Sequence, residues 1–488
     1  MNKTMKRVTL FLALLFSAAL LHAENLRVAH IFSDHMVLQR ESTVPVWGWG
    51  EPGAKVTVAT NWNGKKVETR VASDGTWRVI VDTRASKEST SLKMMTIKSG
   101  KATITLNDVL LGEVWICAGQ SNMEMPLRGF GYQSVEGAMD AIMEAGSTAR
   151  DIRVLDIKTG KQTSPVDDIE AVWELSTPGV AAKCSAVGYF FAKRLNKALG
   201  CPVGIIVNAW GGSRIEPWMT CGTIDDSGLN EIQLGVIYSI EEQDDCWPET
   251  PELIWNGRMA PIVGYGIRGF LWYQGCSNMG QPDCYDILQN AMVRFWREQW
   301  GYGDLPFIYA LLAPYAHGDA DGRWRPFFVE DQMKTADAIP AAWYVPTETL
   351  GHKDTIHPAK KREIADMMCL RALQNVYGMS LGIDIEAPLL ESVQYQEDGS
   401  AQISLTHVWS DLGSVYQREI TGFEMAGEDR VFHLAEAEVN KDGTVTVRCA
   451  EVPHPVAIRY GWRNWMGANL SKTNGIPVPP FRTDDWEY

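Results

Sequence analysis

The sequence predicts an α/β domain built on a parallel sheet and flanked by an N-terminal and a C-terminal β-sandwich-like module. Short strand-like runs separated by turn residues occupy residues 24–108. Apolar runs of strand length then alternate with helical periodicity from 109 to 384, and strand-like runs return from 385 to 488. A chain of 488 residues exceeds what one hydrophobic core usually accommodates, so several domains are expected.

Residues 24–108 are expected to form an antiparallel β domain. Pro-Gly, Asn-Gly and Asp-Gly pairs separate its strands, and these are typical hairpin turns. Its tryptophans are interpreted as packing residues, with a sugar-binding platform as the alternative: Trp47, Trp49, Trp62 and Trp77. The expected strands span 44–49, 55–60, 66–71, 76–81 and 92–97.

The sequence pattern of residues 109–384 predicts a parallel sheet with helices on both faces. Near-continuous apolar strands alternating with helices are typical of this arrangement. One helix is expected over 186–199, before Gly200, and a closing helix over 359–377, beginning after His357-Pro358. The expected strands are 114–118, 152–157, 203–207, 269–273, 306–312 and 342–345. In the C-terminal module they are 392–395, 401–406, 444–448 and 457–460.

The charge and the N-terminus restrict the partners and the location. A formal charge of −15 with no basic stripe excludes nucleic acid and anionic membrane surfaces as expected partners. Lys3, Lys6 and Arg7 precede an apolar run over 8–21, and Ala23 offers a small residue for cleavage. The apolar run is shorter than a membrane span requires. We therefore expect residues 1–23 to be a signal peptide and the mature chain to be periplasmic or secreted.

The cysteines do not define a metal or redox motif. There are nine, scattered, without a Cys-x-x-Cys pair. Cys276 and Cys284 are near enough for a local disulfide, although sequence spacing does not specify connectivity. Most of the others lie in apolar segments and are expected to be core thiols.

A serine follows the first expected strand of the α/β domain. The apolar run 114–118 stops at Gly119, and Ser121 comes two residues later. Open parallel sheets bind ligands at the carboxyl ends of their strands. Ser121 is therefore either a helix cap or a nucleophile exposed at this edge, and the rest of the sheet decides between the two.

A histidine and a carboxylate follow the last expected strand. Asp354 and His357 are three residues apart on the loop before the closing helix. In a parallel sheet this loop meets the edge that carries Ser121. A carboxylate–imidazole hydrogen bond there would orient the histidine as a base for the serine.

Two further loops reach the same edge. The segment 208–213 contains Gly211 and Gly212, whose backbone can approach a ligand closely. The segment 274–278 contributes the side-chain amides of Gln274 and Asn278. A nucleophile, a base and oxyanion donors together predict a serine hydrolase.

These loops resemble the four blocks of the SGNH hydrolase superfamily, and most closely its sialate O-acetylesterase family. Segments of both β modules resemble the same family, so the similarity covers nearly all of the mature chain. The blocks are Gly119-Gln120-Ser121-Asn122-Met123, Trp210-Gly211-Gly212-Ser213, Trp272-Tyr273-Gln274-Gly275-Cys276-Ser277-Asn278 and Asp354-x-x-His357-Pro358. The resemblance implies an SGNH-type three-layer α/β/α domain.

It also implies roles for residues of this sequence. Ser121 would be the nucleophile, His357 the base and Asp354 the orienting acid. The oxyanion hole would combine the N–H groups of Ser121 and Gly212 with an amide of Asn278 or Gln274. The expected substrate-binding residues are Gln120, Trp210, Arg214 and Trp272. No metal or organic cofactor is implied.

One position departs from the family pattern, which usually has Glu where this chain has Cys276. None of the inferred catalytic groups is lost, so we expect an active carbohydrate O-acetylesterase, with sialic acids as the leading substrate. The alternatives are an acetylesterase acting on xylan or pectin and a catalytically impaired carbohydrate-binding relative. A lipase fits poorly, since the sequence contains no apolar lid segment.

Overall fold

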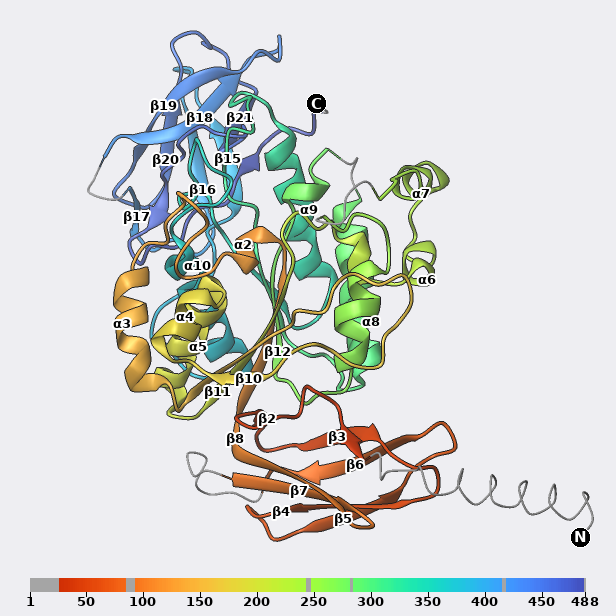
Figure 1. Ribbon diagram of the computed structural model, residues 1–488. Coiled ribbons are helices and arrows are strands. Elements are labelled where there is room, and N and C mark those ends of the chain that lie inside the picture. The colour runs from red at the N-terminus through yellow and green to blue at the C-terminus, as the bar shows by residue number, and fades with distance from the viewer. Residues whose placement is uncertain (1–25, 85–92, 243–246, 281–283, 415–417, 487–488) are drawn as a thin grey trace, which may run out of the picture.

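The computed structural model describes residues 26–84, 93–242, 247–280, 284–414 and 418–486. The expected signal peptide lies outside these residues. Two β modules sit at opposite ends of a central α/β domain (Figure 1). Helix α2 (Ser121–Glu124) lies at the end of the central domain that faces the C-terminal module.

The N-terminal module consists of short strands that pair antiparallel, as expected, except for β2, which pairs in parallel with β8. Trp77 is buried, Trp47 packs edge-on against Phe32, and the Arg27 guanidinium lies over the ring of Trp49. These contacts support the packing interpretation of the tryptophans. The strands are β1 (Arg27–Val28), β2 (Val37–Gln39), β3 (Thr43–Trp49), β4 (Lys55–Thr60), β5 (Lys66–Arg70), β6 (Thr76–Asp82) and β7 (Lys93–Ser99).

Strand β8 (Ala102–Gly119) joins the N-terminal module to the central domain. Its first part pairs antiparallel with β7, and its second part pairs in parallel with two strands of the central sheet. The expected strand 114–118 is therefore only the end of a longer one. The expected domain boundary at 108/109 falls inside β8, because a single strand contributes to both sheets.

The central sheet has the strand order β10-β9-β11-β8-β12-β13-β14. Every pair along this path is parallel except β9 with the edge strand β10, which the sequence analysis did not predict. The strands are β9 (Ile152–Asp156), β10 (Trp173–Leu175), β11 (Val203–Ala209), β12 (Gly269–Tyr273), β13 (Phe307–Ala310) and β14 (Ala342–Val345).

Helices cover both faces of this sheet, which confirms the three-layer arrangement (Figure 1). Successive residues of β8 point to opposite faces: Trp115 and Cys117 contribute to the core under α5 and α10, whereas Val114 and Ile116 contribute to the core under α8 and α9. The α-helices are α3 (Ala138–Thr148), α4 (Pro178–Lys183), α5 (Ala186–Leu199), α6 (Cys221–Asp225), α7 (Glu231–Tyr238), α8 (Tyr285–Trp300), α9 (Trp324–Ala338) and α10 (Lys361–Arg371). Short 3₁₀ and π segments are η1 (Glu216–Trp218), η2 (Trp255–Met259), η3 (Ala260–Ile262), η4 (Cys276–Asn278) and η5 (Ala372–Val376).

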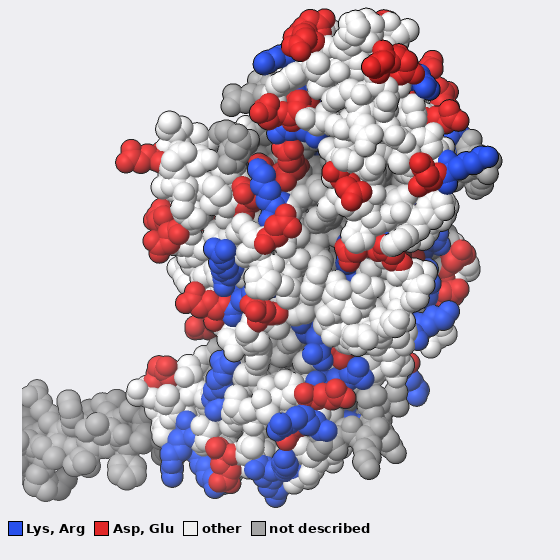
Figure 2. Space-filling model, turned by 180° about the vertical axis from the view of Figure 1, so that it is seen from behind, with Lys and Arg blue, Asp and Glu red and all other residues white. Residues whose placement is uncertain are grey.

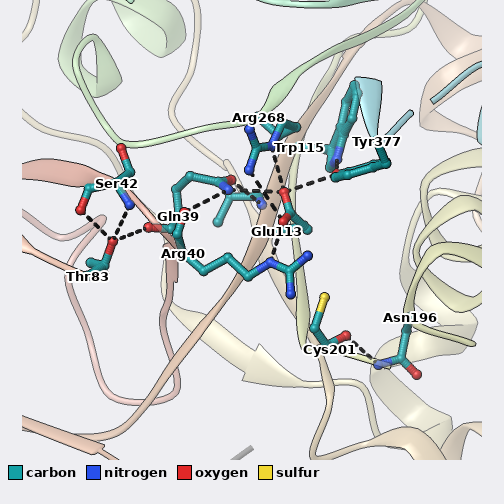
Figure 3. A network of polar contacts seen from close by, with 11 residues as sticks. Gln39, Arg40, Ser42, Thr83, Glu113, Trp115, Asn196, Cys201, Arg268 and Tyr377 are labelled. Carbon is teal, nitrogen blue, oxygen red and sulfur yellow. Dashed lines mark hydrogen bonds and ion pairs between the residues drawn. The ribbon is translucent and has the colours of Figure 1, made fainter. Parts of the chain in front are cut away.

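A buried carboxylate ties the N-terminal module to the central domain (Figure 3). Glu113 on β8 is fully buried and accepts hydrogen bonds from Arg40 Nε at 2.5 Å and Arg268 Nε at 2.8 Å. Gln39 Nε2 and Tyr377 Oη also donate to it, each at 3.0 Å. Burial alone would raise the pKa of Glu113, but these donors and charges lower it. Both parts of the chain thus share one ionic centre.

The C-terminal module is held to the loop that follows β14. Arg325 on α9 donates to both carboxylate oxygens of Glu348 at 3.0 and 2.9 Å, and to the carbonyl of Gly461 in the module at 3.0 Å. The module's strands are β15 (Leu390–Tyr395), β16 (Ala401–Leu405), β17 (Leu412–Gly413), β18 (Ile420–Ala426), β19 (His433–Val439), β20 (Val445–Arg448), β21 (Ala457–Tyr460), β22 (Ser471–Lys472) and β23 (Phe481–Arg482).

Acidic and basic side chains are interspersed on the face shown in Figure 2, and the described residues drawn there form no continuous basic stripe. Within the described part of the chain, no helix has both the length and the apolar character of a membrane span.

Candidate active site

The serine corner depends on a close approach between β8 and β12. Gly119 has φ +134°, and a Cβ atom there would lie 2.3 Å from the carbonyl oxygen of Tyr273. The N–H of Gln120 donates to the same oxygen at 3.0 Å. Only glycine fits this conformation at this distance. The tight corner sends the chain directly into α2, with Ser121 as its first residue.

Ser121 and His357 meet at the carboxyl edge of the sheet. Ser121 Oγ lies 2.7 Å from Nε2 of His357, although the two residues are 236 positions apart. The distance is that of a serine–imidazole hydrogen bond, as needed by a nucleophile and its base.

Gln133 occupies the other side of the imidazole. Its Oε1 lies 2.8 Å from His357 Nδ1, and its Nε2 donates to Thr355 Oγ1 at 3.0 Å. Because the amide N–H₂ is directed to Thr355, Oε1 is the acceptor and Nδ1 carries the proton. Nε2 is then free to accept the proton of Ser121, which is the tautomer that a general base requires.

Asp354 does not take the orienting position expected of it. It is exposed, and its N–H donates to His352 Nδ1 at 3.1 Å. Among the described residues, its carboxylate makes no hydrogen bond or ion pair with His357. The reason is the direction of the ring: Nδ1 points toward the 128–133 turn, and Phe130 packs edge-on against the imidazole at 5.4 Å between centroids.

The turn that carries Gln133 is tightly closed. Phe130 and Gln133 exchange two backbone hydrogen bonds, of 3.0 and 2.7 Å. Gly129, with φ +79°, precedes the turn, and a Cβ atom there would lie 2.1 Å from the Gln133 carbonyl oxygen. The turn thereby positions Phe130 and Gln133 against the same histidine.

The environment of His357 favours its neutral form. Burial, and then the positive charge of Lys361, lower the pKa of His357 to about 4. Lys361 is itself buried, which lowers its pKa to about 7. Its Nζ donates to Asn122 Oδ1, and Asn122 Nδ2 donates to the Ile356 carbonyl at 3.1 Å. This chain of contacts joins the serine corner to the histidine loop.

Two backbone N–H groups at the corner are available to an oxyanion. Within the described structure, neither the Ser121 N–H nor the Gly212 N–H donates to a protein acceptor. The neighbouring Gly211 N–H donates to Glu124 Oε2 at 2.7 Å, and burial raises the pKa of that carboxyl. A Cβ on Gly211 would lie 3.5 Å from Ser121 Cβ, so the glycine loop lies directly beside the serine.

The amides of Asn278 and Gln274 hold the loops instead of facing the oxyanion. Asn278 Nδ2 donates to both oxygens of Glu216 at 3.2 and 3.0 Å, and its Oδ1 accepts from Ile215 N–H. Gln274 Nε2 donates to Asn278 Oδ1 and to the Ser213 carbonyl. Both side chains are 1% exposed. With their N–H groups occupied and buried, neither has the position expected of a third oxyanion donor.

Among the four expected substrate contacts, two are buried. Trp272 is fully buried and donates to Tyr285 Oη at 3.3 Å. Gln120 is 3% exposed, and its Oε1 accepts from the Gly275 N–H at 2.9 Å. Both side chains therefore support the site from within, because apolar strand faces and loop closure bury them.

The other two lie at the rim. Trp210 is partly buried, and the Arg258 guanidinium lies 4.1 Å from its ring centroid. Arg214 donates to the Ser277 carbonyl at 3.3 Å and to Glu216 at 3.2 Å. Burial lowers the pKa of Arg258 to about 10.

The described cysteines are free thiols, Cys276 and Cys284 included. No group of three or more His, Cys, Asp or Glu residues in the described ranges is arranged to hold a metal ion.

Sequence reasoning did not find Gln133, Thr355, Glu124 or Lys361. Gln133 lies in a turn marked only by Gly129 and Gly131, and glycine turns are common. Thr355 lies between Asp354 and His357, and the sequence analysis assigned the orienting role to the Asp354 carboxylate. A pattern of residues does not reveal which polar side chain an imidazole will face.

Comparisons with known proteins find related carbohydrate esterases. Residues 111–369 match a family described as carbohydrate esterase, sialic acid-specific acetylesterase. The chain is 26% identical to the sialate O-acetylesterases of Homo sapiens and Mus musculus; 93% of this chain aligns with 92% of the human protein and 94% of the mouse protein. A crystal structure of a carbohydrate acetylesterase from Xanthomonas citri superposes with a TM-score of 0.82 at 30% identity, covering 94% of this chain and all of that one.

Proposed function

The chain belongs to the family of carbohydrate esterases described as sialic acid-specific acetylesterases, and on that premise we propose that it removes O-acetyl groups from sugars through an acetyl-serine intermediate. Removing such a group hydrolyses a carboxylic ester on a sugar. This is the activity of a carbohydrate O-acetylesterase. The observation that carries the serine mechanism is the 2.7 Å contact between Ser121 Oγ and His357 Nε2.

The reaction begins with proton transfer. His357 accepts the Ser121 proton at Nε2 while Oγ attacks the acetyl carbonyl carbon, and the carbonyl π electrons move to oxygen. The N–H groups of Ser121 and Gly212 stabilise this oxyanion. When the tetrahedral intermediate collapses, the C–O bond to the sugar breaks, and the imidazolium returns its proton to the sugar oxygen.

Water completes the cycle. His357 takes a proton from a water molecule that attacks the acetyl-serine carbonyl, and the second tetrahedral intermediate releases acetate. Ser121 recovers its proton from the imidazolium. Gln133 keeps Nδ1 protonated throughout, so Nε2 alone exchanges protons in both halves of the reaction.

O-acetylated sialic acids are the first substrate candidate, because the mammalian relatives are named sialate O-acetylesterases. Neutral acetylated glycans such as xylan are the second. A specific observation favours them: the guanidinium groups of Arg214 and Arg258 beside the site already engage Glu216 and the Trp210 ring. A sialate carboxylate would have to compete for these cations.

The decisive experiment measures acetate release by the wild type, Ser121→Ala and His357→Ala. The probes are 4-nitrophenyl acetate, 9-O-acetylated sialyllactose and acetylated xylo-oligosaccharides. Either active-site substitution should reduce kcat/KM by at least about 10³-fold. Ser147→Ala, at an exposed serine of α3, is the matched control and should match the wild type. Equal rates for Ser121→Ala and the wild type would overturn the serine mechanism.

We also propose that the protein is exported after cleavage near Ala23. The support is the sequence pattern of residues 1–23. N-terminal sequencing of the protein from a periplasmic or culture fraction tests this proposal, and an intact N-terminal Met1 would contradict it.

A further inference from the structure

An exposed tryptophan lies against the glycine loop of the site. Trp247 is 60% exposed. A Cβ atom on Gly212 would lie 2.4 Å from its Cδ1 and 2.6 Å from its Cγ. The indole therefore covers the Cα of the residue whose N–H is available to the oxyanion, while much of the ring remains open to solvent.

The segment behind Trp247 is anchored to the same loop. The Arg214 N–H donates to the Pro248 carbonyl at 3.3 Å. The Glu242 carboxylate accepts hydrogen bonds from the N–H groups of Glu249 and Thr250, each at 3.1 Å, and it pairs with Lys161. These hydrogen bonds and this ion pair hold the segment next to Trp247 against the Gly212 loop. The indole therefore has a fixed position, which a ligand-binding aromatic residue requires.

The other tryptophans discussed at the site are buried, or have a guanidinium over the ring. Trp218 and Trp272 are fully buried, and they pack edge-on against each other at 5.3 Å between centroids. Trp210 has the Arg258 guanidinium over its ring. A large exposed apolar surface beside a polar catalytic centre indicates a ligand contact more strongly than a core residue does.

We propose that Trp247 forms a sugar-binding subsite, on which the pyranose ring of the acetylated glycan stacks. The inference rests on the proposed function. When the acetyl carbonyl oxygen faces the N–H groups of Ser121 and Gly212, the sugar bonded to that acetyl group must lie within a few ångströms of the glycine loop. The indole is the broad apolar surface at that place, and it suits the apolar C–H face of a pyranose ring.

The kinetic test compares two substrates of different size. Trp247→Ala should lower kcat/KM both for 4-nitrophenyl acetate and for whichever acetylated oligosaccharide the wild type hydrolyses. The decrease for the oligosaccharide should be at least tenfold larger, and it should come mainly from a higher KM. Trp247→Tyr, which keeps an aromatic ring, should recover most of the loss. Trp409→Ala removes a 78% exposed tryptophan of the C-terminal module and should change neither substrate. A similar loss on both substrates, or none on the oligosaccharide, would overturn the subsite.

A binding test separates this proposal from the proposed function. Acetylated xylo-oligosaccharide and 9-O-acetylated sialyllactose are titrated calorimetrically into Ser121→Ala and into Ser121→Ala/Trp247→Ala. Binding that weakens at least tenfold in the double variant supports the subsite, even if the wild type releases no acetate from these sugars. Equal binding by both variants, or binding by neither, would overturn the subsite even if acetate release supports the esterase.

A third measurement tests the packing itself. Gly212→Ala should lower the melting temperature, because the new methyl group meets Trp247 and the residue has φ +74°. In a Trp247→Ala background the same substitution should cause a smaller decrease, since only the backbone strain remains. Equal decreases in both backgrounds would contradict the placement of the indole on Gly212.

Discussion

The Nδ1 atom of His357 lies 2.8 Å from Oε1 of Gln133, a residue 224 positions earlier in the chain. A neutral amide in this position fixes the tautomer of the imidazole as a carboxylate would. It adds no negative charge to stabilise the imidazolium, however. An aspartate would both fix the tautomer and stabilise the imidazolium by its charge, whereas Gln133 only fixes the tautomer.

The pH dependence of activity should reflect this neutral environment. Burial and Lys361 lower the pKa of His357 to about 4. The base works when deprotonated, so kcat/KM for 4-nitrophenyl acetate should be retained down to about pH 5 and lost as the pH falls through about 4. A pH–rate profile of the wild type tests this expectation. An acidic limb near pH 6.5, the ordinary value for histidine, would contradict it.

Gln133→Glu should shift the acidic limb of the pH–rate profile to higher pH. A carboxylate beside Nδ1 favours the imidazolium, so the pKa of His357 should rise by about 1–3 units. Gln133→Ala removes the acceptor and should lower kcat by about 10–100-fold, because the tautomer and ring direction are no longer held. Both are measured as pH–rate profiles.

Asp354→Asn is the control for these two variants, since the exposed carboxylate makes no contact with His357 in the described structure. Its profile should match the wild type. If Asp354→Asn instead lost activity while Gln133→Ala did not, the assignment of the orienting group to Gln133 would be wrong.

Loss of the Glu113 carboxylate should destabilise the junction of the N-terminal module and the central domain. Glu113→Ala leaves Arg40 and Arg268 without their shared partner, and breaking a buried ion pair typically costs about 3–5 kcal/mol. Urea unfolding at pH 7 measures the loss. Glu68→Ala removes one partner of an exposed pair with Lys55 and should lower the unfolding free energy far less than Glu113→Ala does, because solvent screens an exposed pair. Equal effects would contradict a stabilising junction.

The departure at Cys276 bears on Lys361, because burial lowers the pKa of this lysine to about 7 and also raises the pKa of the neighbouring Cys276 thiol to about 12, which keeps that thiol neutral. The unfolded chain keeps the lysine proton up to about pH 10.4, whereas the folded chain loses it near pH 7. This group therefore increases the free energy of unfolding as the pH rises above about 7. Cys276→Glu would supply a carboxylate and raise the pKa of Lys361. The increase in unfolding free energy between pH 7 and 9 should therefore be smaller in Cys276→Glu than in Cys276→Ser. Identical increases would show that the carboxylate does not reach Lys361.

Local patterns predicted several elements closely. The expected ranges 55–60, 186–199, 269–273 and 342–345 coincide with β4, α5, β12 and β14. In α5 the reason is local, since the Ser185 side chain caps the first turn and Gly200 ends the helix with φ +61°. In β8 the pattern failed because its first half alternates in the N-terminal sheet and its second half is buried on both faces.

What the sequence determined by itself was the position of Ser121 and His357. Each residue follows a strand of a parallel sheet, and parallel strands bring their carboxyl ends to one edge whatever the details of packing. The tertiary structure alone decided which polar group faces Nδ1 of His357, which amides are buried, and which tryptophan remains exposed. Those outcomes depend on side-chain directions within about 3 Å, and residues as distant as Gln133 and His357 reach such distances only through packing.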